Sequence, residues 1–497
     1  MRSLLAFMLA FTLCLLPATA ANGADNGEDC GETPEYEGYI VCCPPERLME
    51  SREQPQLRGA AGNLDHVVDD VYLTQSAEYA DWLLSSGQAE YIEPNYVATL
   101  FDVEPDGSES ADWPRELLHC DYAGSLGLDG SGIRIATVDS GIDTNNPNLT
   151  EANIITGYDY VSQSVVMSDD VGHGTKVAQL ICGDDNGTGV TGIARGCELV
   201  PLRCFSSSHS ATVVELALAV TEAATRYNCD VINMSLGLKN YSLTLHRAIQ
   251  YADSLGVVTV AAAGNVSYSF PQGSAIYPAA FDEVISVGSV DSELNIASDS
   301  MQNEFLTVCA PGRGISFVTA SGAITVSSGT SFACPCVSAV AALLKQHAGF
   351  SRAECMSLMC ARSLDLGQPG FDVAYGYGLP QLDRLLQHTL SGLGGGVLSA
   401  SLLRSGGGTV VLAAYDESGQ LLSANTASTA SRFTAIQLTL PDGAASGAAF
   451  FLDADGVPLC MCARYEIVSP DPEEPEETEE PEETAEPEDP GESEDPE

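Results

Sequence analysis

Basic residues and long hydrophobic runs are both scarce in this sequence. Its 497 residues include 20 lysines and arginines against 69 aspartates and glutamates, a formal net charge of −49. Such a chain repels nucleic-acid phosphates and anionic lipid headgroups, so we expect no nucleic-acid partner. Tryptophan occurs only twice, yet the hydrophobic fraction of 44% is ordinary for a globular protein. At roughly 100 to 200 residues per domain, the chain is long enough for several domains.

The one long apolar run lies at the start of the chain. Residues 4–16 follow Arg2 and precede Ala18-Thr19-Ala20, which has the small-residue spacing of a leader cleavage site. The run of about 13 residues is shorter than the roughly 20 that a spanning helix needs. We therefore expect a signal peptide over residues 1–20, a protein that is secreted or held at the extracellular surface, and no membrane span.

Cysteine is frequent but gives no metal signature. Loss of Cys14 with the leader would leave an odd number, 16 − 1 = 15. Pairs such as Cys334/Cys336 have one residue between them, and no Cys or His cluster at zinc-like spacing accompanies them. The sequence leaves two alternatives for these cysteines, which are disulfides formed after export and small buried free thiols.

The pattern of apolar runs divides the chain into four further parts. Residues 21–112 predict a small α+β unit, with strands at 39–41 and 90–94, a helix at 76–85 and a linker at 103–111. Residues 391–468 predict a small antiparallel β module, because short strands alternate with Gly-containing turns. The Pro/Glu-rich tail at 469–497 cannot form a core and is expected to be disordered.

The largest part, residues 113–390, alternates apolar strands with helices. Continuous apolar strands separated by helices indicate an α/β fold, a doubly wound parallel sheet covered on both faces. In such sheets the chemistry lies beyond the carboxyl ends of the strands. The expected strands are 133–138, 199–204, 231–234, 257–262 and 284–287, and the expected helices include 213–225 and 243–254.

Three reactive side chains stand among small residues at element boundaries. Asp139 ends a strand, His173 lies between two glycines at a helix start, and Ser331 follows Gly329-Thr330 at another helix start. Each alone has an ordinary role, as a turn residue, a loop histidine or a helix cap. Together they have the order Asp, His, Ser, which is the order of the triad in subtilisin.

Residues 113–390 resemble the subtilisin family (subtilases) of serine proteases. Further motifs carry the resemblance in the family's order: Ser235-Leu236-Gly237, Ala262-Ala263-Gly264-Asn265, Tyr277-Pro278, which resembles the family's cis-proline turn, and Tyr375-Gly376-Tyr377-Gly378. The resemblance implies a serine endopeptidase acting on proteins or peptides. An α/β-hydrolase is disfavoured because Phe332 and Ala333 follow Ser331, where its elbow needs Gly-x-Ser-x-Gly.

The resemblance also implies roles for single residues. His173 would be the general base that activates Ser331, and Asp139 would orient the imidazole. Asn265 would stabilise the oxyanion together with the backbone N–H of Ser331. The substrate-binding residues implied by the motifs are Ser235, Leu236, Gly237, Ala262 and Gly264.

Several residues depart from the family pattern. Lys176 stands where a histidine is usual, Phe332 replaces a methionine, and Cys336 replaces a frequent histidine. The edge segment 205–209, which usually offers a Gly-rich rail to the substrate, is rich in serine. Ile276 would lie at the base of the main specificity pocket, where its bulk predicts a preference for small residues before the scissile bond.

A structural calcium ion is the one cofactor that the resemblance suggests. The loop 184–192 resembles the family's calcium loop, in which carbonyls and a side-chain amide coordinate the ion. Asn148 replaces the usual aspartate, which weakens the charge contribution. A solvated Asp-Asn-Gly turn is the alternative. The candidate ligands are Asn148, Asp184, Asn186, Thr188 and Val190.

The segment 90–96 resembles the end of the family's inhibitory propeptides. We therefore expect a zymogen whose own propeptide inhibits it, with cleavage between Tyr96 and Trp113. Two alternatives remain. In one, the β module and tail form a surface-binding unit and the protease is a catalytically weak scaffold. In the other, the enzyme is a maturation protease with one partner substrate.

Overall fold

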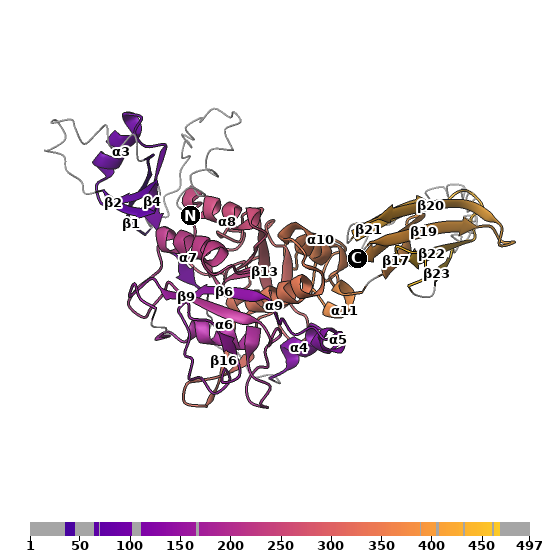
Figure 1. The fold of residues 1–497 in the computed structure, drawn as a ribbon, viewed down its shortest axis with the longest axis horizontal. Helices are drawn as coiled ribbons and strands as arrows, with labels where there is room; N and C mark the ends of the chain where they lie inside the picture. The colour runs from indigo at the N-terminus through magenta and orange to yellow at the C-terminus, as the bar shows by residue number, and fades with distance from the viewer. Residues whose placement is uncertain are drawn as a thin grey trace, which may run out of the picture. The chain divides into compact units, whose positions relative to one another are not determined.

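The computed structural model describes residues 35–44, 64–68, 70–101, 111–165, 168–387, 389–403, 407–430, 433–459 and 462–467. The expected signal peptide, nearly all of the expected linker and the acidic tail lie outside these residues. The chain forms two compact units that divide after Gln387 (Figure 1).

The first unit is built on a sheet whose paired strands run parallel. The order is β14-β13-β12-β10-β6-β9-β7, and β8 also pairs with β9. The strands are β6 (Arg134–Asp139), β7 (Asn153–Ile154), β8 (Tyr158–Asp159), β9 (Glu198–Arg203), β10 (Val231–Met234), β12 (Val258–Ala262), β13 (Val284–Val290) and β14 (Val308–Pro311). The chain steps to β9 on one side of β6 and to β10 on the other, so the switch point lies at the carboxyl end of β6.

Helices cover both faces of this sheet. Helices α7 (Val213–Thr225) and α8 (Leu243–Ser254) pack together on one face, while α6 (His173–Cys182) and α9 (Thr330–Ala348) pack on the other (Figure 1). This arrangement confirms the predicted doubly wound α/β fold. Shorter elements complete the unit: α4 (Trp113–Leu117), α5 (Cys120–Ser125), β11 (Leu236–Gly237), the β15 (Ile315–Val318) and β16 (Ile324–Ser327) hairpin, α10 (Arg352–Arg362) and α11 (Leu382–Leu385).

A small antiparallel sheet precedes this core, as the sequence predicted. Its strand order is β2-β3-β1-β4, and α3 (Ala77–Ser85) packs against it around Val41 and Leu83. The strands are β1 (Tyr36–Cys42), β2 (Asp65–Val68), β3 (Val71–Thr74) and β4 (Tyr91–Tyr96), and β5 (Thr99–Leu100) follows outside the sheet.

This small sheet is docked on the N-termini of α7 and α8. The Glu93 carboxylate accepts hydrogen bonds from the backbone N–H groups of Leu243 (2.9 Å) and Thr244 (3.0 Å) at the start of α8. Asn95 Oδ1 accepts one from the N–H of Val214 (3.2 Å) at the start of α7. These N–H groups have no partner within their helices, and a carboxylate is stabilised at a helix N-terminus.

The second unit is an antiparallel β module, which confirms that prediction. One sheet has the order β17-β18-β21 and the other β20-β19-β22-β23, with a core that includes Leu402, Leu412 and Phe451. The strands are β17 (Thr389–Gly394), β18 (Val397–Leu403), β19 (Gly408–Tyr415), β20 (Leu421–Thr429), β21 (Phe433–Thr439), β22 (Ser446–Leu452) and β23 (Ala463–Glu466).

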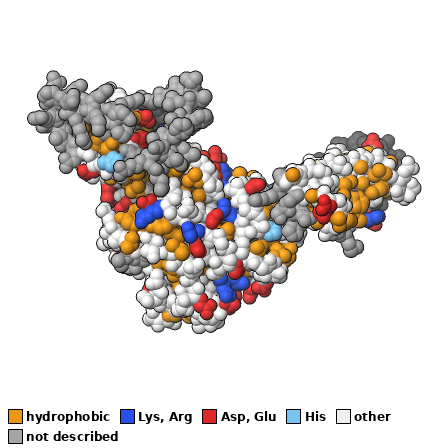
Figure 2. All heavy atoms as spheres, viewed as in Figure 1, with side chains coloured by type: hydrophobic (Ala, Val, Ile, Leu, Met, Phe, Trp, Pro, Cys, Tyr) orange, Lys and Arg blue, Asp and Glu red, His pale blue; other side chains and the backbone are white. Residues whose placement is uncertain are grey.

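The distribution of charged side chains and cysteines can now be compared with the composition of the chain. On the face drawn in Figure 2, lysine and arginine lie in small separate spots among acidic side chains rather than in one basic patch. No disulfide joins two cysteines of the described residues, and these cysteines are buried apart from Cys360 and Cys462. Among the residues described, none of the helices has the length and apolar character to cross a bilayer.

Candidate active site

A buried carboxylate and a buried imidazole meet at the switch point of the sheet. Asp139 is the last residue of β6 and His173 the first of α6, and Asp139 Oδ1 lies 2.7 Å from His173 Nδ1. Both side chains are nearly inaccessible, at 0% and 2% exposure. The N–H of Ser140 also donates to Asp139 Oδ1, at 2.7 Å. Because an ionised carboxylate only accepts, this contact fixes the histidine proton on Nδ1 and leaves Nε2 as the basic atom.

Ser331 lies at the start of α9 but does not cap it. The cap position is taken by Gly329, whose φ of 139° is strained for any residue with a side chain. Ser331 Oγ donates to the carbonyl oxygen of Ser235 (3.0 Å), and Ser235 Oγ donates to the carbonyl oxygen of Ser331 (2.8 Å). The His173 ring lies 5.6 Å, between centroids, from the ring of Phe332. The fold thus brings the Asp139–His173 pair beside the helix start that bears Ser331.

Asn265 presents a donor that the described protein leaves unused. Its Oδ1 accepts hydrogen bonds from Thr330 N (3.0 Å) and Thr330 Oγ1 (2.9 Å), which fixes the orientation of the amide. Its Nδ2 is buried and has no hydrogen-bond partner among the described residues. An unsatisfied buried donor costs about 1–3 kcal/mol and needs an explanation. Sequence reasoning missed Thr330, although it lies next to Ser331 in the motif.

An extended segment of the same chain lies beside these residues. Strand β5 pairs antiparallel with β11, with Leu100 opposite Leu236 and Thr99 opposite Gly237. On its other side, Ala98 N donates to Ala211 O at 2.8 Å. The segment therefore runs between two backbone rails, and one of them is the predicted substrate-binding motif 235–237.

Phe101 is the last described residue of this segment, and it is buried beside Gly237 and Phe270. Its ring packs edge to face against Phe270, with centroids 5.6 Å apart. A methyl group added at Gly237 would come within 2.5 Å of the Phe101 ring, and one at Gly264 within 2.9 Å of Ile276. Only glycine leaves this room at both positions. Ala262 is the last residue of β12 and is also buried.

The carbonyl oxygen of Phe101 and the unused amide of Asn265 lie near the same point over Gly329. A methyl group added at Gly329 would lie 2.8 Å from Phe101 O and 2.9 Å from Asn265 Nδ2. Both atoms therefore flank the same small space over Gly329, at the start of α9.

The residues that depart from the family pattern pack around this site. The Lys176 ammonium lies 5.7 Å from the centroid of the Phe332 ring, and Cys336 Sγ donates to Phe332 O at 3.3 Å. Burial raises the pKa of Cys334 to about 12, so this thiol near Ser235 stays protonated and is not a competing nucleophile.

The predicted calcium ligands hold one another by hydrogen bonds. Asn148 Nδ2 donates to Val190 O at 2.8 Å, and Asn186 Oδ1 accepts from Thr188 N at 2.9 Å. Asp184 is predicted to bind through its backbone carbonyl, and its carboxylate accepts a hydrogen bond from Thr150 N at 2.8 Å. The Asn148 amide thus donates to the Val190 carbonyl oxygen that a cation would need as a ligand. The candidate ligands also lack the negative charge that hard cations prefer. Structural calcium is common in subtilases, but these residues as arranged do not fit the ion.

Comparison with known proteins gives the family. The model of the Subtilase family matches residues 130–378. Subtilisin DY of Bacillus licheniformis is 35% identical over 272 residues, which are 54% of this chain and 97% of that protein. Minor extracellular protease Epr of Bacillus subtilis is 32% identical over a region that covers 63% of this chain and 48% of that protein. M-protease of Shouchella clausii is 35% identical over a region that covers 54% of this chain and 67% of that protein. The chain therefore belongs to the subtilase family and is a serine endopeptidase.

Proposed function

We propose that the chain is a secreted endopeptidase, made as a zymogen, that cleaves proteins or peptides through Asp139, His173 and Ser331. The observation that carries this proposal is the buried 2.7 Å contact between Asp139 and His173, beside the helix that bears Ser331. A serine hydroxyl is a weak nucleophile until a base takes its proton. The pair supplies a base whose tautomer is already fixed.

Catalysis requires the Ser331 hydroxyl to turn from Ser235 O toward His173 Nε2. Catalytic hydrogen bonds are often long or misdirected before substrate binds and tighten in the complex. His173 then takes the proton as Ser331 Oγ attacks the substrate carbonyl, and Asp139 stabilises the imidazolium. His173 later gives the proton to the leaving amine, and water hydrolyses the acyl-enzyme.

The oxyanion of each tetrahedral intermediate is stabilised by Asn265 Nδ2 and the backbone N–H of Ser331. The unsatisfied Asn265 amide supports this role. The free-energy cost of removing this amide from water is met when the protein folds, and its hydrogen bond forms only when negative charge develops on the substrate oxygen. Thr330 acts on the oxyanion indirectly, since it holds the Asn265 amide in one orientation.

The segment preceding the peptidase, within residues 21–112, is the inhibitory propeptide in this proposal. It docks through Glu93 and Asn95, and its tail fills the cleft between the two rails. A substrate binding there would have to displace it. The position of Phe101 O beside Asn265 narrows the expected cleavage, between Tyr96 and Trp113, to the bond that follows Phe101.

The pocket occupied by Phe101 changes the expected specificity. Ile276 predicted a preference for small residues, yet the Phe101 ring is accommodated beside Gly237 and packs on Phe270. The buried Ile276 lies against Gly264 and leaves the ring its place. We therefore propose a preference for aromatic residues before the scissile bond, in place of the small residues expected from sequence.

Export and the remaining boundaries are proposed on the sequence alone. The proposal keeps the signal peptide at 1–20, the peptidase at 113–390, the β module at 391–468 and the acidic tail at 469–497. The alternative, a surface-binding protein with a weak protease scaffold, draws on the separate β module. It is disfavoured by the preserved geometry around His173.

Self-processing is the first prediction. Incubation of the purified precursor should give a new chain beginning at Asp102, found by N-terminal sequencing, and the Ser331→Ala precursor should stay uncut. Cleavage of the Ser331→Ala protein at the same bond would mean that another protease makes the cut. A cut distant from Phe101 would contradict the proposed junction.

Removal of the oxyanion donor should act on kcat. Asn265→Ala in the processed enzyme should lower kcat by about 10²- to 10³-fold with little change in KM, because the amide contacts the substrate mainly in the transition state. Thr330→Val, which keeps shape but loses the hydroxyl, should give a smaller loss of the same kind. An Asn265→Ala enzyme with wild-type kcat would refute this role.

Specificity should depend on the aromatic contact in the pocket. Peptides with Phe or Tyr before the scissile bond should be cleaved faster than those with Ala. Phe270→Ala should lower kcat/KM for the Phe peptide by about 2- to 10-fold, the worth of an aromatic pair, while the Ala peptide serves as the control. A library profile dominated by small residues would restore the original expectation from Ile276.

Chelation should leave the thermal stability nearly unchanged. A calcium ion present at 100 times its Kd would contribute about 2.7 kcal/mol, or roughly 5–10 °C in Tm for a unit of this size. Because Asn148 already binds Val190 O, we expect EDTA to shift Tm by much less than that. A calcium-reversible drop of this size would show that the loop rearranges to hold the ion.

A further inference from the structure

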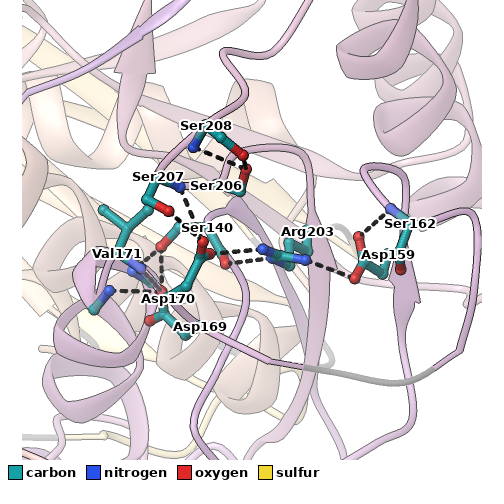
Figure 3. Close-up of polar contacts among 12 residues, drawn as sticks. Ser140, Asp159, Ser162, Asp169, Asp170, Val171, Arg203, Ser206, Ser207 and Ser208 are labelled. Atoms are coloured by element: carbon teal, nitrogen blue, oxygen red, sulfur yellow. Dashed lines mark hydrogen bonds and ion pairs between the residues drawn. The ribbon is translucent and has the colours of Figure 1, made fainter.

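A buried arginine contacts three segments of the chain, one of which directly follows Asp139 (Figure 3). Arg203 ends β9 and is 7% exposed. Its Nε donates to Ser140 O (3.1 Å), its Nη1 to Asp159 Oδ2 (2.7 Å) and its Nη2 to Asp170 Oδ1 (2.6 Å). Burial of a guanidinium is costly unless its donors are paired in good geometry, so Arg203 strongly favours the one arrangement that satisfies all three.

The first of these segments is the end of β6, and it is linked to the loop before His173. Asp169 Oδ1 accepts hydrogen bonds from Ser140 Oγ (2.8 Å) and Gly172 N (2.7 Å). Ser140 Oγ in turn accepts from Gly174 N (2.9 Å). The residue after Asp139 and both neighbours of His173 thus belong to one hydrogen-bonded group, which sets the distance across the pair.

The second segment leads to the substrate cleft. Asp170 Oδ2 accepts hydrogen bonds from Ser207 N (3.1 Å) and Ser207 Oγ (2.7 Å). Ser207 lies in the edge segment 205–209, which continues into Ala211, the residue that binds the propeptide backbone at Ala98. The hydrogen bond from the Ser207 hydroxyl is the main reason that the pKa of Asp170 is lowered to about 2, so this carboxylate is ionised at any working pH.

We propose that Arg203 and Asp170 are positioning residues that couple the substrate-edge segment to the His173–Asp139 pair. Asp170 shares its two oxygens between Arg203 and Ser207, so movement of the edge segment is transmitted to the carbonyl of Ser140 and from there to the pair. The edge segment has serines where a Gly-rich rail is usual, and Ser207 is the one that Asp170 holds. The inference rests on the proposed function, since it assigns these residues to the same reaction.

The test uses the full chain with two variants and a matched control. Asp170 is 42% exposed, and Asp170→Asn keeps the shape of its side chain. The new amide N–H₂ group would face Arg203 or Ser207, which are both hydrogen-bond donors to Asp170. Arg203→Met keeps bulk and removes the charge. Arg352→Met is the control, because Arg352 makes a comparable two-point ion pair with Asp253 (3.0 and 3.1 Å) that joins α10 to α8.

Two readouts separate positioning from stability. In processed enzyme, Arg203→Met should lower kcat by about 10-fold or more on short and long peptides alike, as displaced catalytic groups do. Asp170→Asn should raise KM by about 5-fold for peptides that reach the edge segment, and much less for short ones. Arg352→Met should lower Tm with kcat and KM unchanged.

The second readout needs no activity. In the Ser331→Ala background, NMR should detect the proton of His173 Nδ1 at low field, shifted or broadened by Arg203→Met and unaffected by Arg352→Met. Folded variants with wild-type kcat, KM and resonance would overturn the proposal, as would equal changes in the control. If Arg203→Met does not fold, Asp170→Asn decides. Absence of peptidase activity in the wild-type chain would refute the proposed function. The resonance of the His173 Nδ1 proton would still show whether Arg203 and Asp170 position the pair.

Discussion

The hydrogen bond between Asp139 and His173 is the contact on which the site depends. Both groups are buried, and each would be costly there without the other. They meet because β6 ends at the switch point of a parallel sheet, where loops from both directions of the sheet converge. The fold therefore holds the His173 ring against Asp139 at the start of α6, while the start of a second helix, α9, bears Ser331.

In the function that we propose, the zymogen and the enzyme use one set of contacts. The backbone rails that hold residues 97–101 would also hold a substrate backbone, and the side chains around Phe101 would contact the residue before the scissile bond. Inhibition and specificity would thus be two aspects of the same surface. Glu93 and Asn95 bind helix N-termini away from these rails, so the proposed propeptide would gain binding energy that a short peptide substrate lacks.

The sequence predicted most of the framework because its signals are local. Apolar β-branched runs identified the strands, and α7 and α8 have the predicted bounds, 213–225 and 243–254. The four-residue strands β2 and β3 escaped prediction, since their polar and apolar residues give no sustained period. Contacts between distant segments could not be predicted either. Nothing in the sequence around Arg203 indicates Ser140 and Asp170 as partners, and the packing of Ile276 against Gly264 is visible only in the fold.

The central claim is that His173 activates Ser331. It is tested most directly by treating the processed protein with an organophosphonate and locating the adduct by mass spectrometry. The account predicts an adduct on Ser331 in the wild-type protein and its loss in folded His173→Ala and Ser331→Ala variants. Absence of an adduct in the wild-type protein, or an equally rapid adduct on Ser331 without His173, would contradict it.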